Sequence, residues 1–293
     1  MKRRRFLQIL AASAAVPGGA VAMDWTGQAL GAEVSLRLRG GPKGAAGRVL
    51  ADLPAVLAAI EREFSLYDPQ SALSRLNAAG RIDHPSDQML QLLHLSDDIH
   101  AATDGLFDPT VQPLWQALAQ GGDVVAARQA IGWQRVAWQG AVQLAPGQAL
   151  TFNGIAQGFA TDLVCALLAR HGFDQALVNI GEFAALGGPW ALGIEDPTFG
   201  QLALRHLTGG AIATSSPMAT LVGGRPHILH PQGGPALWST IAVEADIAAL
   251  ADGLATALVL APRSMAERVL AQVPGVRRIT LVGFDGDLTT LAA

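Results

Sequence analysis

An aspartate and a threonine lie four residues apart in the segment Ala251-Asp252-Gly253-Leu254-Ala255-Thr256. Residues four apart lie on one face of a helix, so Asp252 and Thr256 would present a carboxylate and a hydroxyl to a single point. A hard cation such as Mg²⁺ prefers oxygen ligands, and phosphate oxygens often complete its shell. The spacing alone is explained more simply by an exposed aspartate and a threonine packed in the core. The helix is apolar nearly all round, however, and a lone aspartate in such a helix needs a partner.

A pair of glycines marks a second candidate site in the segment 151–162, where a predicted strand runs into a predicted helix. Gly154 and Gly158 would let backbone amides and carbonyls approach a ligand closely. The start of a helix also favours phosphate. Such glycines are more common in purely structural turns, so the segment by itself does not decide between the two.

Two further segments carry aromatic or titratable side chains in loops. The segment Thr103–Thr110 is followed by Pro113 and Leu114. This pattern is equally compatible with a loop that lines the binding site of a flat ring and with a structural turn. His227 and His230 are three residues apart, a pattern that suggests a base or a pair of soft-metal ligands. No cysteine lies nearby and the pattern supplies no third ligand, which argues against zinc.

The elements that must position these residues alternate irregularly along the chain. Ser86 and Asp123 are plausible N-caps of two of the predicted helices. Helical spacing predicts helices over 87–103, 124–131, 154–171 and 246–260. Alternating or continuous apolar runs predict strands over 31–39, 136–152, 176–180, 190–194, 209–214 and 240–244. Because there is no regular βαβ alternation, we expect the α+β class.

The composition is that of a globular chain with a large core. Half of the 293 residues are hydrophobic, and the formal net charge is −4. This balance gives no electrostatic signature for nucleic acid, and we expect no nucleic-acid partner. The single cysteine, Cys165, excludes an internal disulfide and is expected to be buried and inert.

The first 22 residues are typical of an export signal. A basic region, Lys2 to Arg5, precedes an apolar run at 6–16, and Ala20-Val21-Ala22 supplies the small-x-small pattern of a cleavage site. The run Arg3–Gln8 resembles the twin-arginine export consensus. The apolar run is shorter than the roughly 20 residues of a spanning helix. We therefore expect a signal at 1–22, a functional domain at 23–293 and a periplasmic protein, which would be membrane-anchored if the signal stays uncleaved.

Taken together and in this order, the segments resemble the FAD:protein FMN transferase family, often called the ApbE family. The resemblance covers most of the chain after the signal. The matching segments are Leu30–Ala32, Phe64–Tyr67 (Phe-Ser-x-Tyr), Ser71–Asn77, Thr103–Thr110 (Thr-x-Gly-x-Phe-Asp-Pro-Thr), Gly154–Asp162 (Gly-x-Ala-Lys-Gly-Tyr-x-x-Asp), Val178–Gly181 (Val-Asn-x-Gly), Ala213–Ser215 and Ala251–Thr256 (Ala-Asp-Ala-Leu-Ala-Thr). Each motif is modest, but so many in the right order are hard to obtain by chance.

The resemblance implies an activity and a fold. The activity is Mg²⁺-dependent transfer of FMN from FAD to a threonine or serine hydroxyl of a target flavoprotein, with release of AMP. Family targets are flavoprotein subunits of membrane electron-transfer complexes. The implied fold is a single large mixed domain with an antiparallel sheet and flanking helices.

The resemblance also implies roles for individual residues. The implied metal ligands are the Ala156 carbonyl, Asp252 and Thr256, and the implied catalytic residues are Asp252 and His227, the candidate base. The implied FAD-binding residues are Leu30, Tyr67, Leu106, Phe107, Asp108, Phe159, His227 and Ile228.

Several positions differ from the family's pattern, and they leave FAD binding better supported than efficient transfer. The differences are Ala72 for Glu, Gln157 for Lys, Phe159 for Tyr, Glu182-Phe183 for Gly-Asp, and His230 for Asp. Two alternatives therefore stay open. One is an FAD-binding maturation or accessory protein with little catalysis. The other is a Mg²⁺-dependent FAD pyrophosphatase, which would release AMP without an acceptor.

Overall fold

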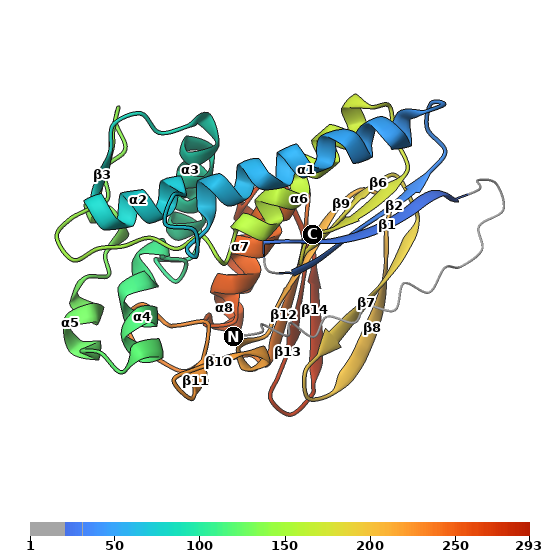
Figure 1. The fold of residues 1–293 in the computed structure, drawn as a ribbon. Helices are drawn as coiled ribbons and strands as arrows, with labels where there is room; N and C mark the ends of the chain where they lie inside the picture. Colours follow the sequence, from blue (N-terminus) through green and yellow to red (C-terminus); the bar gives the residue numbers. More distant parts are fainter. Residues whose placement is uncertain (1–20, 31) are drawn as a thin grey trace.

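The molecule is built around an eight-stranded sheet, and the helices pack beside it (Figure 1). The computed structural model describes residues 21–30 and 32–293. The strand order is β1-β2-β5-β6-β9-β12-β13-β14, and every neighbouring pair is antiparallel. The strands are β1 (Val21–Ala29), β2 (Ala32–Arg39), β5 (Ala176–Asn179), β6 (Phe183–Leu186), β9 (Gly210–Ser215), β12 (Thr240–Ala245), β13 (Val276–Val282) and β14 (Leu288–Ala292). The predicted α+β class with an antiparallel sheet is confirmed.

Helices supply the second layer and a group at one end of the molecule (Figure 1). They are α1 (Ala45–Phe64), α2 (Ala72–Ala79), α3 (Asp87–Ala102), α4 (Gln112–Gln120), α5 (Val124–Gln129), α6 (Ala156–Arg170), α7 (Ala248–Leu258) and α8 (Arg263–Gln272), with short 3-10 turns at Pro109–Val111, Trp133–Arg135 and Pro217–Ala219. Both predicted N-caps are confirmed. Ser86 Oγ accepts from the backbone N–H of Met89 at 3.0 Å, and Asp123 Oδ1 accepts from that of Val125 at 2.9 Å.

The central strands are buried on both faces, and their side chains alternate between two cores. In β5, Ala176 and Val178 belong to the main core under the helices, whereas Leu177 belongs to a second core on the other face. In β12, Val243 faces the main core and Ala242 the second. This period of two is what a pleated strand requires. The sheet therefore separates a helical layer from a β layer.

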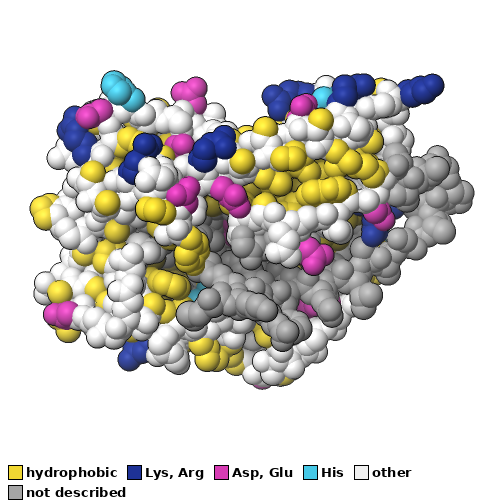
Figure 2. All heavy atoms as spheres, viewed as in Figure 1, with side chains coloured by type: hydrophobic (Ala, Val, Ile, Leu, Met, Phe, Trp, Pro, Cys, Tyr) yellow, Lys and Arg dark blue, Asp and Glu magenta, His cyan; other side chains and the backbone are white. Residues whose placement is uncertain are grey.

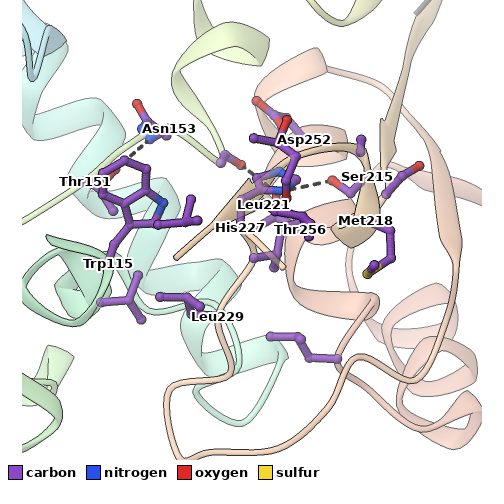
Figure 3. Close-up of a pocket in the computed structure, with 18 of the residues that line it drawn as sticks. Trp115, Thr151, Asn153, Ser215, Met218, Leu221, His227, Leu229, Asp252 and Thr256 are labelled. Carbon is purple, nitrogen blue, oxygen red and sulfur yellow. Dashed lines mark hydrogen bonds between the residues drawn. The ribbon is translucent and has the colours of Figure 1, made fainter. Parts of the chain in front are cut away.

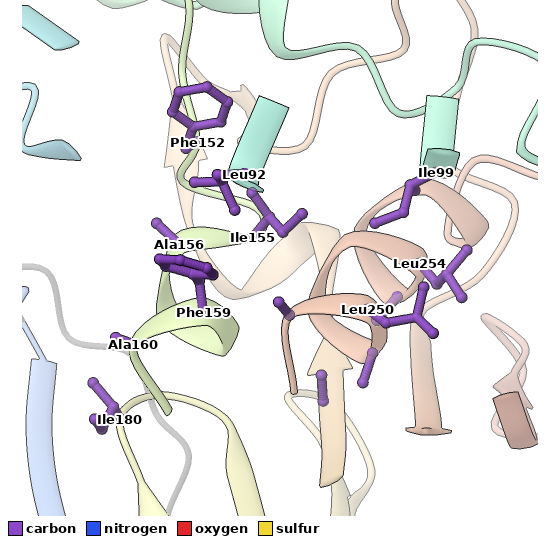
Figure 4. Packing of buried hydrophobic residues seen from close by; sticks show 14 of the residues in the cluster. Leu92, Ile99, Phe152, Ile155, Ala156, Phe159, Ala160, Ile180, Leu250 and Leu254 are labelled. Carbon is purple, nitrogen blue, oxygen red and sulfur yellow. The ribbon is translucent and has the colours of Figure 1, made fainter. Parts of the chain in front are cut away.

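The second core is covered by a hairpin of β7 (Trp190–Asp196) and β8 (Gly200–Leu207). The main core includes the segment that leads into α6, and Figure 4 shows Phe152, Ile155 and Phe159 on the α6 side, with Leu250 and Leu254 on α7. Both groups are deeply buried. Because this packing is apolar and close, it fixes α6 and α7 against each other.

Two shorter pairs complete the strands: β3 (Arg81–Ile82) with β4 (Val142–Gln143), and β10 (Leu221–Val222) with β11 (Arg225–Pro226). Of the strands predicted over 136–152, only β4 and an isolated bridge between Ala137 and Gln143 form. A side chain holds the backbone at Leu150. The Asn77 amide bonds both the N–H and the carbonyl of Leu150, at 2.7 and 2.8 Å.

The predicted export segment falls almost entirely outside the described residues. Residues 1–20 are not described, and Val21 and Ala22 are the first residues of β1. Among helices within 21–30 and 32–293, none is long and apolar enough to cross a membrane.

On the face seen in Figure 2, many of the Lys and Arg side chains lie along the upper edge, where Figure 1 places α1 and its neighbours.

Candidate functional site

A large pocket lies beside the α6–α7 pair, with a volume of about 1140 Å³. Typical small-ligand pockets measure roughly 300–1,000 Å³, so this one suits a large ligand of more than one part. Its lining comes from α4, α7, the turn before α6, the ends of β7 and β9, and the segment 214–229. In Figure 3, Trp115 lies on the opposite side of the close-up from Asp252 and Ser215.

Asp252 and Thr256 of α7 both line this pocket. The Asp252 carboxylate is only 4% exposed, and its Oδ2 accepts a hydrogen bond from the backbone N–H of Gly158 at 3.1 Å. Thr256 Oγ1 donates to the Gly154 carbonyl at 3.3 Å and lies 3.4 Å from Ser215 Oγ (Figure 3). Three kinds of oxygen therefore meet here: carboxylate, hydroxyl and backbone carbonyl.

The two glycines of the turn bring α7 this close. A Cβ on Gly154 would lie 2.9 Å from Thr256 Cγ2, and a Cβ on Gly158 would lie 2.3 Å from the Ala248 carbonyl oxygen. Real Cβ atoms do not approach backbone that closely, so only glycine fits at position 158 without a shift of α7. The glycines therefore have a packing role that sets the position of Asp252 and Thr256.

Asp162 fixes the start of α7 from the side of α6. Ile247, at the N-cap position, makes no side-chain cap bond. Instead, the Asp162 carboxylate accepts from the backbone N–H groups of Ala248 and Ala249 at 2.7 and 2.9 Å. Burial raises the pKa of Asp162 to about 6, although these two hydrogen bonds act in the opposite direction. The aspartate that ends the Gly154–Asp162 motif thus caps the helix that carries the site.

The His227 ring is oriented by backbone carbonyls. Its Nδ1 lies 3.1 Å from the carbonyl oxygens of both Pro217 and Thr220. A carbonyl can only accept, so Nδ1 carries the proton in the neutral ring and Nε2 is the basic nitrogen. His227 also lines the pocket, together with Ile228. His230, in contrast, is not among the lining residues, and burial lowers its pKa, with a smaller contribution from Arg128.

The loop at 103–110 is rigid through its own hydrogen bonds. Thr103 Oγ1 accepts from the Phe107 N–H at 3.2 Å, and Asp108 Oδ1 accepts from the N–H and hydroxyl of Thr110. Burial raises the pKa of Asp108, and the hydrogen bonds from Thr110 partly offset it. Leu106, Phe107 and Asp108 all line the pocket.

The structure brings most of the predicted site residues together. Those that line the pocket are Tyr67, Leu106, Phe107, Asp108, His227, Ile228, Asp252 and Thr256. Three others do not. Phe159 packs edge-on against Phe64 in the core, with ring centroids 5.9 Å apart. The Leu30 N–H donates to Glu61, and Ala156 is the buried first residue of α6.

Sequence reasoning did not single out several residues that line the pocket. Trp115 follows directly after Pro113 and Leu114, so the motif that includes those two residues could have pointed to Trp115 as a lining residue. Glu182 was noted as a departure but not as a site residue, and it follows directly after Val178–Gly181. Glu195 and Asp196 also line the pocket, and no motif marked them.

The donor set fits a small hard cation. Asp252, Thr256 and the Gly154 carbonyl offer only oxygen, which Mg²⁺ prefers, and Mg²⁺ usually keeps ligands from water and phosphate. Over the described ranges, no cluster of three or more His, Cys, Asp or Glu could hold a metal. Lys and Arg are absent from the described lining.

The chain matches the model of the ApbE family over residues 30–280. It is 28% identical to the FAD:protein FMN transferase of Klebsiella pneumoniae over 257 residues, which are 76% of this chain and 73% of that protein. Among solved structures, it superposes on the apo form of Pseudomonas stutzeri flavinyl transferase ApbE with a TM-score of 0.80 at 27% identity, covering 94% of each chain. The flavin transferase ApbE of Vibrio cholerae gives a TM-score of 0.81 at 22% identity, covering 94% of this chain and 98% of that chain.

The family model covers most of the chain, and the sheet, the helical layer and the motifs all agree with it. The predicted resemblance is therefore confirmed, and the chain belongs to the ApbE family.

Proposed function

We propose that the protein transfers FMN from FAD to a threonine or serine hydroxyl of a target flavoprotein, with Mg²⁺, and releases AMP. The observation that carries this proposal is the meeting of Asp252, Thr256 and the Gly154 carbonyl in a pocket that also contains His227. The relative from Klebsiella pneumoniae, an FAD:protein FMN transferase, supports the same activity.

The residues divide into those that hold the reacting phosphates and those that move a proton. Asp252, Thr256 and the Gly154 carbonyl would hold Mg²⁺, which when bound polarises the pyrophosphate and neutralises developing charge. The Ala156 carbonyl stays the ligand implied by the family resemblance. His227 Nε2 accepts the proton of the attacking hydroxyl. The hydroxyl oxygen bonds to the FMN-side phosphorus, the bond from that phosphorus to the bridging oxygen breaks, and AMP leaves with that oxygen.

The remaining lining suits flat rings. Trp115, Leu106 and Phe107 offer aromatic and apolar surface on which an adenine or a flavin ring can stack. Of the positions that differ from the family, Ala72, Gln157 and His230 are not among the described lining residues. These three substitutions therefore weigh less against catalysis than the sequence alone suggested.

The test is a transfer assay with the purified full chain, FAD and Mg²⁺. The acceptor is a threonine-bearing flavoprotein domain, and the control is the same domain with that threonine changed to alanine. We expect covalent flavin fluorescence on the first acceptor only, with AMP in equal amount, and none after chelation with EDTA. AMP released equally without any acceptor would identify a pyrophosphatase, and bound FAD without AMP would identify an accessory protein.

The variant Asp252→Asn isolates the charge at the site. The amide oxygen can still accept from the Gly158 N–H, so the fold should survive while the carboxylate charge is lost. We expect activity to fall by roughly 100- to 1000-fold, the range for a lost electrostatic group in an active site. Asp246→Asn, at a half-exposed ion pair with Arg277, is the matched control and should stay active. Full activity in Asp252→Asn would refute the metal assignment.

We propose further that the protein acts after export, in the periplasm. Residues 1–22 support this through their basic, apolar and small-residue regions, which resemble a twin-arginine signal. The proposed acceptor is a flavoprotein subunit of a membrane electron-transfer complex. Replacing Arg3 and Arg4 by Lys should leave the protein in the cytoplasm, as cell fractionation would measure. Unchanged periplasmic recovery would contradict the twin-arginine route.

A further inference from the structure

Asp196, the last residue of β7, lies at the edge of the pocket with both carboxylate oxygens hydrogen-bonded, and it is 3% exposed. Its Oδ1 accepts from the backbone N–H groups of Thr198 and Phe199 at 2.7 and 3.2 Å. Its Oδ2 accepts from Ser239 Oγ and Thr240 Oγ1, both at 2.6 Å. Burial raises the pKa of Asp196, but these hydrogen bonds outweigh burial and hold the pKa below its ordinary value. The carboxylate is therefore charged at neutral pH and can only accept hydrogen bonds.

This carboxylate sets the direction of two hydroxyl groups in a row. A hydroxyl carries a single proton. Thr240 donates its proton to Asp196, so Thr240 Oγ1 can only accept from Ser216 Oγ, which lies 2.7 Å away. Ser216 therefore donates its own proton to Thr240. The Ser216 oxygen keeps only lone pairs for any further partner.

Ser216 lies where a ligand ring can reach it. It lines the pocket, is only partly buried, and directly precedes the 3-10 turn Pro217–Ala219. Met218 of this turn also lines the pocket and is 49% exposed. Thr240 is fully buried and is not among the described lining residues. A flat ring packed on Met218 would therefore have its edge within reach of Ser216, two residues earlier in the chain.

We infer that Ser216 is a hydrogen-bond acceptor of fixed direction that selects an N–H group on the edge of one of the two ring systems of FAD. The inference rests on the proposed function for its ligand and adds a specificity residue to it. FAD has two kinds of ring-edge N–H donor, the flavin N3–H and the exocyclic amino group of adenine. A ring edge that offered only acceptors would place lone pairs against lone pairs and leave buried polar groups unpaired. The site should therefore discriminate against a ligand that lacks the donor.

The first test measures the dissociation constant for FAD by flavin fluorescence, with the purified full chain, Mg²⁺ and no acceptor protein. Ser216→Ala removes the acceptor, and Thr240→Val keeps the side-chain shape but frees the Ser216 proton to turn toward the ligand. We expect the dissociation constant to rise by about 3- to 10-fold in each variant, the range for one hydrogen bond.

Ser239→Ala is the matched control for these variants. It removes the other hydroxyl from the same Asp196 oxygen but leaves the contact between Thr240 and Ser216 in place. Because it shares no ligand contact with Ser216, its dissociation constant for FAD should change by less than about twofold.

Two FAD analogues identify the ring that donates. 3-Methyl-FAD lacks the flavin N3–H, and the purine analogue has a hydrogen atom in place of the adenine amino group. We expect one of them to bind the parent chain about 3- to 10-fold more weakly than FAD does. The same analogue should bind Ser216→Ala as well as FAD does, because one hydrogen bond is lost only once. A merely structural role of Ser216 would not produce this coupling.

Each outcome bears on one claim. Equal affinity for FAD in Ser216→Ala and the parent chain would overturn the inference, and so would an analogue loss that is as large in Ser216→Ala as in the parent chain. An equal loss in Ser239→Ala and Thr240→Val would also overturn it. If Ser216→Ala does not fold, Thr240→Val decides with the same analogues. A parent chain that binds no FAD refutes the proposed function itself, whereas bound FAD with no change in these variants refutes the inference alone.

Discussion

Two parts of the pocket lining are built differently. At the α6–α7 contact, Asp252 is 4% exposed and is held by the Gly158 N–H, within helices that pack through glycine contacts. In the exposed part of the lining, Tyr67 is 71% exposed, and Met218 and Leu221 are about half exposed. Leu221 lies in β10, a strand of two residues, and Met218 lies in a single 3-10 turn.

This difference indicates a division of labour. The chemistry of a phosphoryl transfer depends on positions held to fractions of an ångström. Those positions are fixed by buried helices, which gives them the stability of the core. The apolar wall holds large ring surfaces and needs area more than exact geometry. Substitutions on the two sides should therefore differ in kind, with stability and turnover affected on one side and ligand affinity on the other.

The largest combined effect on stability and turnover is expected from Gly158→Ala. The added Cβ would lie 2.3 Å from the Ala248 carbonyl oxygen, so α7 must move away from α6. We expect a loss of about 3 kcal/mol in the free energy of unfolding, the upper range for overpacking. A displacement of about 1 Å should also cost roughly 100-fold in turnover. Urea denaturation and the transfer assay measure the two effects.

Gly47→Ala is the matched control. Gly47 is exposed within α1, and nothing lies within 4 Å of its added Cβ. Alanine is the better helix former by about 1 kcal/mol, so this variant should be slightly more stable and fully active. If Gly158→Ala behaved like Gly47→Ala, the close helix contact would have no part in positioning the site.

The next largest effect is expected from pH, through Asp162. Burial raises its pKa to about 6, from an ordinary value of 3.8. The folded state therefore holds the proton of Asp162 more tightly than the unfolded state does. The protonated Asp162 side chain contributes its full share of the free energy of unfolding below about pH 4. That contribution is lost as pH rises through about 6. A shift of about two units corresponds to at most about 3 kcal/mol.

Asp162→Asn removes the titration but leaves one oxygen to cap α7. We expect the stability of the parent chain relative to this variant to fall between pH 4 and pH 7, measured by urea denaturation at each pH. If the hydrogen bonds from Ala248 and Ala249 outweighed burial, the relative stability would rise over the same range instead. That rise would contradict the assigned direction of the pKa.

The buried side of the pocket was also the more predictable from sequence. The Asp252–Thr256 spacing and the two glycines are local patterns on regular elements, and helix geometry alone places them on common faces. Glu195 and Asp196 could not be found in this way. They reach the pocket only because β7 and β8 fold over the sheet as a hairpin, and β8 itself was not predicted.

The strand prediction failed where tertiary contacts replaced local pattern. Of the strands expected over 136–152, only β4 and an isolated bridge form, and the Asn77 side chain, 73 residues away, holds the backbone of Leu150. This partner lies far away in the sequence, where periodicity and propensity carry no information.

The smallest effect is expected on the exposed wall, from Leu221→Ala. Leu221 lines the pocket while 48% exposed, so its loss leaves no buried cavity. We expect unfolding free energy within about 0.5 kcal/mol of the parent chain. The lost apolar contact, at roughly 0.8 kcal/mol per methylene, should raise the KM for FAD by about 3- to 10-fold with kcat little changed.

Leu204→Ala tests whether that loss belongs to the pocket. Leu204 is 44% exposed on β8 and is not among the lining residues, so it matches Leu221 in type and exposure but lacks the ligand contact. Its KM for FAD should stay unchanged. A fall in kcat for Leu221→Ala as large as that for Gly158→Ala would mean that the exposed wall also sets the reacting geometry. The division between a positioning side and an affinity side would then be wrong.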